Sequence, residues 1–274
     1  MNTFKITLMC LFVSTMVCAN VSQTEKEALI ALCNATQGEK WNTTWNLDEP
    51  VETWYGVTVE DNQVVELNLH MNNLQGTLPQ EIGNLTHLRK INLGFNNLKG
   101  TLPLAFFNLK ELNTVQLFMN SLTGSIPNEI AQLTKLEVLE LFSNSFNGEI
   151  PHSIGELVNL RALLLGSNFL SGEIPNEIAK LVQLEKLSLM DNKLEGHIPY
   201  QIGDLKELKE LVLSSNSLIG NIPIELNNLS NLNVMMLSGN NLNQDIVSIV
   251  DRDPTEVKTE IQIHTATSVA ADED

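Results

Sequence analysis

The sequence predicts an α/β solenoid, a right-handed coil with a parallel β-sheet on its concave side and a helical cap at its N-terminal end. Three regularities predict this fold. Asparagine recurs every 24 residues from position 72 to position 240, glycine follows four residues after the first seven of them, and proline follows three residues after each glycine. Such a period is typical of repeat architectures, in which each unit buries its apolar side chains only by stacking on its neighbours.

The repeat at residues 136–159 shows why these residue types recur. Leu139 and Leu141 alternate with outward residues, as a short strand requires. Asn144 closes the strand, and its amide is expected to pair with backbone groups of adjacent coils. Gly148 permits a backbone conformation that other residues avoid. The proline that follows keeps its preceding residue extended, and a helix-like turn is expected to return the chain to the core.

The recurring asparagines are therefore predicted to form a structural ladder along the array: Asn72, Asn96, Asn120, Asn144, Asn168, Asn192, Asn216 and Asn240. Successive coils should lie about 4.8 Å apart, the spacing of paired strands. The segment 64–242 resembles the plant-type subclass of leucine-rich repeats, with the pattern LxxLxLxxNxLxGxIP, which residues 184–199 follow directly. The resemblance implies the solenoid fold, but receptors, inhibitors and adhesins share this scaffold, so it leaves the function open.

Four segments are predicted along the chain: a signal peptide at residues 1–19, an N-terminal cap at 20–63, a repeat array at 64–242 with about 7.5 repeats, and a C-terminal cap with an acidic tail at 243–274. Lys5 and the apolar run at 6–17 are typical of an export signal, and the run is too short to span a bilayer. Cleavage after Ala19 would place the protein outside the cell or on its surface. A lipid anchor on Cys18 is the alternative, although the preceding residues suit a lipobox poorly. The mature chain would keep Cys33 alone, which is expected to be buried and inert.

The N-terminal cap is expected to begin with a helix. Thr24 and Glu27 have the spacing of a capping box, and Gly38 is expected to end the helix. The cap resembles that of exported bacterial repeat proteins, because it lacks the paired cysteines that plant receptors carry around the stretch matching 54–57. All tryptophans of the chain lie here, and they are expected to cover the first coil, with sugar stacking as the alternative: Trp41, Trp45 and Trp54. At the other end, residues 245–250 could form a short amphipathic cap.

Composition excludes several classes of function. The formal net charge of −17 repels phosphate backbones, so no nucleic-acid ligand is expected, and it disfavours anionic membranes. No segment after the signal is long and apolar enough to span a membrane. The five histidines lack metal-ligand spacing, and no nucleophile elbow, phosphate loop or Cys-x-x-Cys motif occurs. We therefore expect no catalysis, no cofactor and no metal.

The outward strand positions are not dictated by the repeat pattern, so they carry the functional prediction. In the N-terminal half they include bulky apolar residues, which mark interaction surfaces: Met71, Phe95, Phe118, Met119 and Phe142. In the C-terminal half, Met190 alone has comparable bulk. The favoured function is binding of a protein or peptide on the concave face. The alternatives are a glycan-binding adhesin that uses the Asn68, Asn92 and Gln116 column with Trp41 or Tyr55, a structural surface protein whose apolar stripe packs on itself, and an enzyme accessory module.

Overall fold

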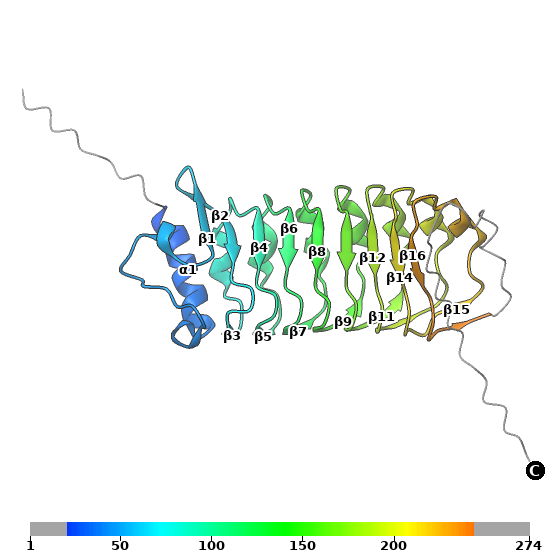
Figure 1. The fold of residues 1–274 in the computed structure, drawn as a ribbon, viewed down its shortest axis with the longest axis horizontal. Coiled ribbons are helices and arrows are strands. Elements are labelled where there is room, and N and C mark those ends of the chain that lie inside the picture. The colour runs from blue at the N-terminus through cyan, green and yellow to red at the C-terminus, as the bar shows by residue number, and fades with distance from the viewer. Residues whose placement is uncertain (1–20, 244–274) are drawn as a thin grey trace, which may run out of the picture.

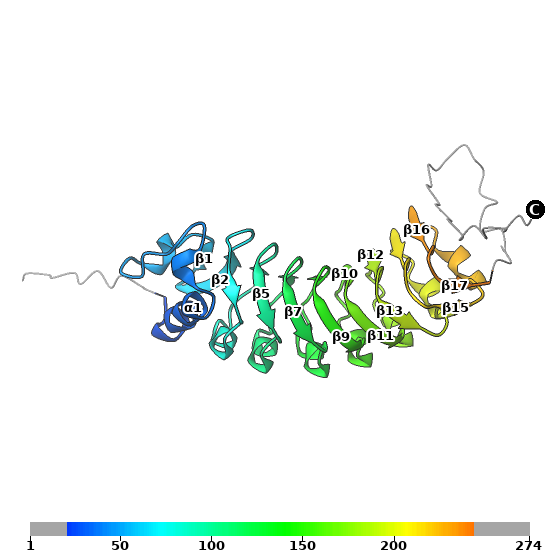
Figure 2. The same ribbon diagram turned by 90° about the horizontal axis from the view of Figure 1, so that it is seen from below.

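The computed structural model describes residues 21–243, which form a cap and an array of stacked coils (Figure 1) that is curved in the turned view (Figure 2). The larger sheet has nine strands, in the order β1 (Val57–Glu60), β2 (Gln63–Asn68), β4 (Lys90–Asn92), β6 (Thr114–Gln116), β8 (Val138–Glu140), β10 (Ala162–Leu164), β12 (Lys186–Ser188), β14 (Glu210–Val212) and β16 (Val234–Met236). Strand β1 is antiparallel to β2. From β2 onward the pairing is parallel with a constant shift of 24 residues, as in Leu139 opposite Leu163, which confirms the predicted sheet.

A second parallel sheet runs along the array and was not anticipated from the sequence. Its six strands are β3 (Gln75–Gly76), β5 (Asn97–Gly100), β7 (Ser121–Gly124), β9 (Ser145–Glu149), β11 (Phe169–Glu173) and β13 (Lys193–Glu195), and β15 (Ile219–Gly220) pairs with β17 (Asn241–Leu242) further on. The sequence does contain an indication of these strands, because the apolar Leu98 stands between the polar Asn97 and Lys99. In the structure Leu98 is buried and its two neighbours are exposed, which is the alternation of a strand. The glycine ending this segment has a positive φ, 77° at Gly148, as its residue type predicts.

Each coil returns through a short 3₁₀ helix on the convex side of the array, visible along the lower edge of Figure 2. A proline precedes each of these helices, whose first turn needs no N–H from it. The helices are η3 (Gln80–Asn84), η4 (Leu104–Asn108), η5 (Asn128–Gln132), η6 (His152–Glu156), η7 (Asn176–Lys180), η8 (Tyr200–Asp204) and η9 (Ile224–Asn228).

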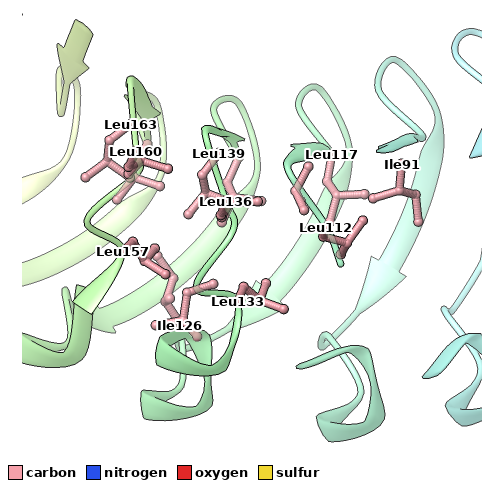
Figure 3. Packing of buried hydrophobic residues seen from close by; sticks show 14 of the residues in the cluster. Ile91, Leu112, Leu117, Ile126, Leu133, Leu136, Leu139, Leu157, Leu160 and Leu163 are labelled. Atoms are coloured by element: carbon pink, nitrogen blue, oxygen red, sulfur yellow. The ribbon is translucent and has the colours of Figure 1, made fainter. Parts of the chain in front are cut away.

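The core is a continuous column of leucine and isoleucine between the two sheets and the 3₁₀ helices. Leu136 and Leu139 of one coil lie beside Leu160 and Leu163 of the next, each no more than 1% exposed (Figure 3). Burying one such side chain contributes about 1.5–3 kcal/mol, and the burial depends on the neighbouring coils. Stability is therefore shared along the array.

The cap begins with helix α1 (Gln23–Ala35), whose N-cap is Ser22. Ser22 Oγ accepts the backbone N–H of Glu25 at 3.2 Å and donates to the Glu25 carboxylate at 2.9 Å. The predicted capping box of Thr24 and Glu27 is thus wrong, because both residues already lie inside the helix. Glu25 is buried, and its other oxygen accepts the backbone N–H of Val64 at 3.2 Å, which ties the helix to β2.

The helix also ends earlier than predicted. Thr36 is its C-cap, and Gln37 rather than Gly38 takes the left-handed conformation, with φ 57°. Gly38 opens η1 (Gly38–Lys40), and a second such turn, η2 (Val51–Thr53), follows in the cap. Glycine is needed at position 38 for space, because an added Cβ would lie 2.0 Å from the Sγ of Cys33. Cys33 is buried, and burial, together with the charge of Glu39, raises its pKa.

The tryptophans of the cap form a packed cluster. Trp41, Trp45 and Trp54 are 4%, 8% and 3% exposed. The rings of Trp45 and Trp54 stack at 4.9 Å, and Trp41 meets Trp45 edge-on at 4.8 Å. Each indole N–H donates to a backbone carbonyl, at 2.9 to 3.2 Å. Their buried faces leave no surface for a stacked sugar, whereas Tyr55 is 48% exposed.

The predicted signal peptide with its cleavage site, the amphipathic segment 245–250 and the acidic tail lie outside the described residues. Within residues 21–243, no helix is long and apolar enough to cross a membrane.

Candidate ligand-binding face

The recurring asparagines connect the coils beneath the concave face. Asn144 Oδ1 accepts the backbone N–H of Leu122 in the preceding coil at 3.0 Å. Its Nδ2 donates to the carbonyls of Leu117 and Leu141, at 3.0 Å each. The same arrangement recurs at other asparagines of the set, including Asn96 and Asn168. These amides satisfy backbone groups that the sheets do not reach.

The residue before each of these asparagines has a left-handed backbone. The φ values lie between 50° and 68° at Met71, Phe95, Met119, Ser143, Ser167, Asp191, Ser215 and Gly239. This corrects the prediction that these residues occupy strand positions, because the strands end earlier, at Gln116 in β6. The hydrogen bonds between coils nevertheless continue, with Met119 N–H donating to Phe142 O at 2.9 Å. A left-handed L-residue costs about 1–2 kcal/mol, so the stacked coils must impose it.

The left-handed turn projects three bulky side chains to the solvent in consecutive coils. Met71 is 60% exposed, Phe95 48% and Met119 43%. They form a lip between the concave sheet and the second sheet. Large apolar side chains held out in a contiguous row are typical of interaction surfaces.

A second row lies one residue earlier in each coil and is half-buried. The rings of Phe118 and Phe142 stack at 4.8 Å with an interplanar angle of 6°. Phe118 also contacts the ring of His70, two coils away, at a centroid distance of 5.6 Å. His70 in turn meets Phe95 of the lip at 6.1 Å. We call the two rows together the aromatic patch: His70, Met71, Phe95, Phe118, Met119 and Phe142.

The contact between Phe118 and His70 is possible because the coil that lies between them has a glycine, Gly94, at the equivalent position. A Cβ added to Gly94 would lie 2.7 Å from Cζ of the Phe118 ring, so the ring rests directly over this glycine. The same arrangement recurs in the C-terminal half, where Met190 lies over Gly166, with Cγ 2.9 Å from the position of a Cβ. The bulky residues stand out in the sequence, but the role of Gly94 and Gly166 beneath a side chain of the following coil was not predicted.

A polar row borders the aromatic patch on the other side. It consists of the last residues of β2, β4 and β6, which we call the amide row: Asn68, Asn92 and Gln116. Asn92 Oδ1 accepts the backbone N–H of Gly94 at 3.1 Å, and Asn68 Oδ1 accepts that of His70 at 3.4 Å. Gln116 Nε2 donates to the carboxylate of Glu140, the last residue of β8, at 2.9 Å.

One atom of the patch has no partner. His70 Nδ1 is buried, and among residues 21–243 nothing donates to it or accepts from it. The aromatic neighbours of His70 cannot form an ordinary hydrogen bond with it. An unpaired buried nitrogen lowers the stability of the fold, typically by about 1–3 kcal/mol.

Met236, the last residue of β16 in the concave sheet, is 36% exposed, so the expectation that Met190 alone is bulky in the C-terminal half is wrong. Further exposed apolar residues lie away from the concave sheet and were not predicted. Val158 and Val182 are 48% and 58% exposed and occupy equivalent places in consecutive coils. Phe169, at the start of β11, is 50% exposed, with the ammonium of Lys193 5.2 Å from its ring centre. Single exposed residues of this kind are common on proteins and need no function.

Charged side chains also pair from coil to coil. Glu185 accepts from Lys209 at 2.5 Å and from Arg161 at 3.1 Å, and these hydrogen bonds lower its pKa. The hydrogen bond from His152 to Glu177, at 2.7 Å, raises the histidine pKa and lowers that of the carboxyl. No group of three or more His, Cys, Asp or Glu side chains in the described part of the chain could hold a metal ion.

The stacked coils, the asparagines beneath the concave face and the curved sheet define a solenoid of repeats. Family models of the leucine-rich repeat match residues 86–146, and also 63–85, 159–181, 183–205 and 207–229. These matches cover more than half of the chain, and the protein belongs to the leucine-rich-repeat family.

Solved structures with the same fold come from plants and bacteria. The Arabidopsis receptor kinase HAESA, solved with the peptide hormone IDA and the co-receptor SERK1, is 30% identical over 81% of this chain and 38% of its own, with a TM-score of 0.74. A plant ice-binding protein is 25% identical over 81% of both chains, with a TM-score of 0.69. A leucine-rich-repeat protein of Leptospira interrogans is 37% identical over 62% of this chain and 42% of its own, with a TM-score of 0.53. The chain thus spans less than half the length of the receptor and of the bacterial protein.

Proposed function

We propose that this protein is a non-enzymatic binding protein that recognises a protein or peptide through the aromatic patch on its concave face. The observation that carries the proposal is the exposure of Met71, Phe95 and Met119 beside the stacked Phe118 and Phe142, in consecutive coils. The apolar core of each coil is complete without these side chains, so the fold does not require them. Aromatic and methionine side chains concentrate binding energy at protein interfaces.

The similar structures support this reading in general terms. HAESA was solved with a peptide hormone, so an array of this type can hold a peptide. The share of the receptor that this chain covers is small, and the ligand is therefore argued from the patch itself. The patch spans only coils of the N-terminal half, which favours a peptide or a small protein domain.

A glycan-binding adhesin is the alternative that the amide row would support. Sugar ligands need exposed aromatic faces beside polar groups, and the cap tryptophans are buried. Tyr55 is therefore the exposed aromatic residue of the cap, and it lies in the turn before β1, not in a row on the concave face. The amide row lies beside the aromatic patch, so polar groups alone do not decide between the two ligands. Two of the three most exposed side chains of the patch are the thioethers of Met71 and Met119, which offer a sugar no ring face and favour a protein ligand.

The test compares two double variants of the chain. Phe118→Ser with Phe142→Ser removes the stacked pair of the aromatic patch, and Val158→Ser with Val182→Ser removes an equally apolar pair outside it. Each protein is used as bait for extracellular extract of the native host, with thermal melting as the folding control. We expect the first variant to lose its bound partner and to melt within a few degrees of the parent, and the control variant to keep the partner.

Two results would contradict the proposal. If the patch variant unfolds while the control does not, the stripe is structural. If it folds and keeps the same partner, the ligand binds elsewhere. Dependence on Asn68 and Asn92 without dependence on Phe118 would favour the glycan alternative.

We also propose that the protein is exported, with cleavage after Ala19, and acts outside the cytoplasm. The support is the sequence of the first 19 residues. N-terminal sequencing of the protein from its host should begin at Asn20, and an intact Met1 would refute this location.

A further inference from the structure

The aromatic patch and the amide row run side by side along the solenoid axis, across β2, β4, β6 and β8, which lie next to one another in Figure 1. A ligand that follows both rows must therefore lie across the strands. It cannot add a strand to the sheet here, because each of β4 and β6 already pairs on both sides. The ligand must instead match the spacing of the coils with its side chains.

The spacing of the coils selects between ligand conformations. Two coils advance about 9.6 Å along the axis. A polyproline II helix has three residues per turn and rises about 9.3 Å per turn, so every third side chain meets every second coil with little drift. An α-helix advances about 5.4 Å per turn against about 4.8 Å per coil, and the mismatch grows to about 2 Å over the four coils of the patch.

The amide row supplies a second argument that does not depend on spacing. The Oδ1 atoms of Asn68 and Asn92 accept backbone N–H groups of their own coils, which leaves their Nδ2 groups as donors. In the part of the chain that the structure describes, neither Nδ2 has a partner. A polyproline II segment has free carbonyl oxygens that these groups can bind, whereas the carbonyls of an α-helix are already paired.

Charge defines one end of the ligand. Glu140 ends β8, two residues before Phe142, and its half-exposed carboxylate accepts one hydrogen bond, from Gln116. Among residues 21–243 the Glu140 carboxylate forms no ion pair. Lys90 of β4 belongs to the same sheet but does not pair with Glu140. The chain as a whole carries a net charge of −17, which attracts a basic ligand.

We propose that the aromatic patch and the amide row bind a proline-rich peptide in the polyproline II conformation, with an Arg or Lys placed against Glu140. This inference rests on the proposed function and specifies the ligand of the same site. Proline rings pack against the aromatic side chains, the Nδ2 groups of Asn68 and Asn92 donate to the peptide carbonyls, and Glu140 pairs with the basic residue. A prolyl peptide loses little conformational entropy on binding, because it is already extended in solution.

The experiment measures binding of labelled peptides of about nine residues to the full chain by fluorescence anisotropy. The probe is an oligoproline that ends in arginine. The comparison peptides are a glycine-serine peptide ending in arginine, an alanine-leucine helix ending in arginine, and an oligoproline ending in glutamine. We expect the proline-arginine peptide to bind at least about tenfold more tightly than the glycine-serine peptide and the helical peptide. Against the oligoproline that ends in glutamine, its affinity should be about threefold higher at low salt.

Variants locate the contacts. Phe118→Ser with Phe142→Ser should weaken binding at least about tenfold, Asn92→Ala should weaken it several-fold, and Val158→Ser with Val182→Ser should leave it unchanged. Glu140→Gln should remove the difference between the arginine and glutamine peptides. Asn92→Ala also removes the hydrogen bond to the backbone N–H of Gly94, so its melting temperature is measured beside its affinity. Glu140→Gln keeps an acceptor for Gln116 and changes only the charge, so it keeps the test valid if the double variant does not fold.

The outcomes separate this inference from the function on which it rests. Equal affinity for the proline and glycine-serine peptides, or tighter binding of the helix, overturns the polyproline conformation. A preference for arginine that survives Glu140→Gln overturns the assignment of the basic residue. In each of these cases, capture of a host protein that depends on Phe118 and Phe142 would still support the proposed function.

Discussion

Replacing Gly94 by alanine would test the arrangement of the aromatic patch without touching any of its rings. Gly94 does not have a positive φ, so its backbone accepts alanine. The added Cβ would lie 2.7 Å from Cζ and 2.8 Å from Cε1 of the Phe118 ring, closer than Cβ atoms approach other heavy atoms in proteins. The ring must therefore swing away, and its contacts with His70 at 5.6 Å and Phe142 at 4.8 Å are lost or weakened.

The expected magnitude follows from two opposing contributions. An aromatic pair contributes about 0.5–1.5 kcal/mol beyond the area that it buries, and two pairs are affected. Replacing glycine by alanine at a permissive position stabilises a protein by about 0.4–1 kcal/mol, because the unfolded chain loses freedom. In the parent protein Gly94→Ala should therefore lower the free energy of unfolding by up to about 2.6 kcal/mol. In a Phe118→Ala background the clash is absent, and the same change should raise it by about 0.4–1 kcal/mol.

Urea unfolding of the parent, the two single variants and the double variant gives the coupling energy between positions 94 and 118. We expect a coupling of about 1–3 kcal/mol. Gly166→Ala is the matched comparison, because the Met190 side chain above it is flexible and can move at lower cost. If Gly94→Ala changed the free energy of unfolding equally with and without the Phe118 ring, the ring would not rest on Gly94.

Three further predictions concern stability. Asn144→Ala should lower the free energy of unfolding by several kcal/mol, since three backbone groups lose partners worth about 1–3 kcal/mol each, whereas exposed Asn147→Ala should be near neutral; equal melting temperatures would contradict this. His70→Phe should raise the melting temperature, because it keeps a ring beside Phe95 and Phe118 and removes the unpaired Nδ1 at a gain of about 1 kcal/mol; a lower melting temperature would contradict this. The lowered pKa of Glu185 means that its ion pairs stabilise the fold above the ordinary carboxyl pKa of about 4.3 and are lost as the pH falls through the folded value. Glu185→Gln should therefore lose less stability than the parent on acidification, and identical acid profiles would contradict the coupling.

The parallel sheet, the coil period and the return turns could be predicted from the sequence because identical constraints recur in every unit. A single repeat is ambiguous, but the common spacing of Asn144, Gly148 and Pro151 with their counterparts removes the ambiguity. The cap has no such repetition. Its helix is capped by Ser22 rather than by Thr24, because the serine also bonds to the carboxylate of Glu25. That carboxylate is itself held by β2, a tertiary contact that the local sequence does not reveal.

The candidate site could be predicted in composition but not in geometry. The bulky residues at positions 95, 118, 119 and 142 stand out because the repeat does not require them. Their placement depends on two features that the pattern alone does not reveal: strands of only three residues, as in β6, and a left-handed turn that directs Met119 outward. The contact of Phe118 with His70 could not be inferred either, since it crosses an intervening coil through the absence of a side chain at Gly94.

This dependence of one coil on the glycine of another has a consequence for how such arrays evolve. Duplication or deletion of one 24-residue unit preserves the hydrogen bonds and the core, because every junction between units is alike. When the change falls at this place in the array, a deletion removes Gly94 from beneath Phe118, and a duplication inserts a further unit between the two residues. The aromatic patch therefore depends on which units are neighbours, whereas the core and the backbone hydrogen bonds are alike at the junctions between units. Unit shuffling can therefore replace the ligand in a single step at almost no loss of stability.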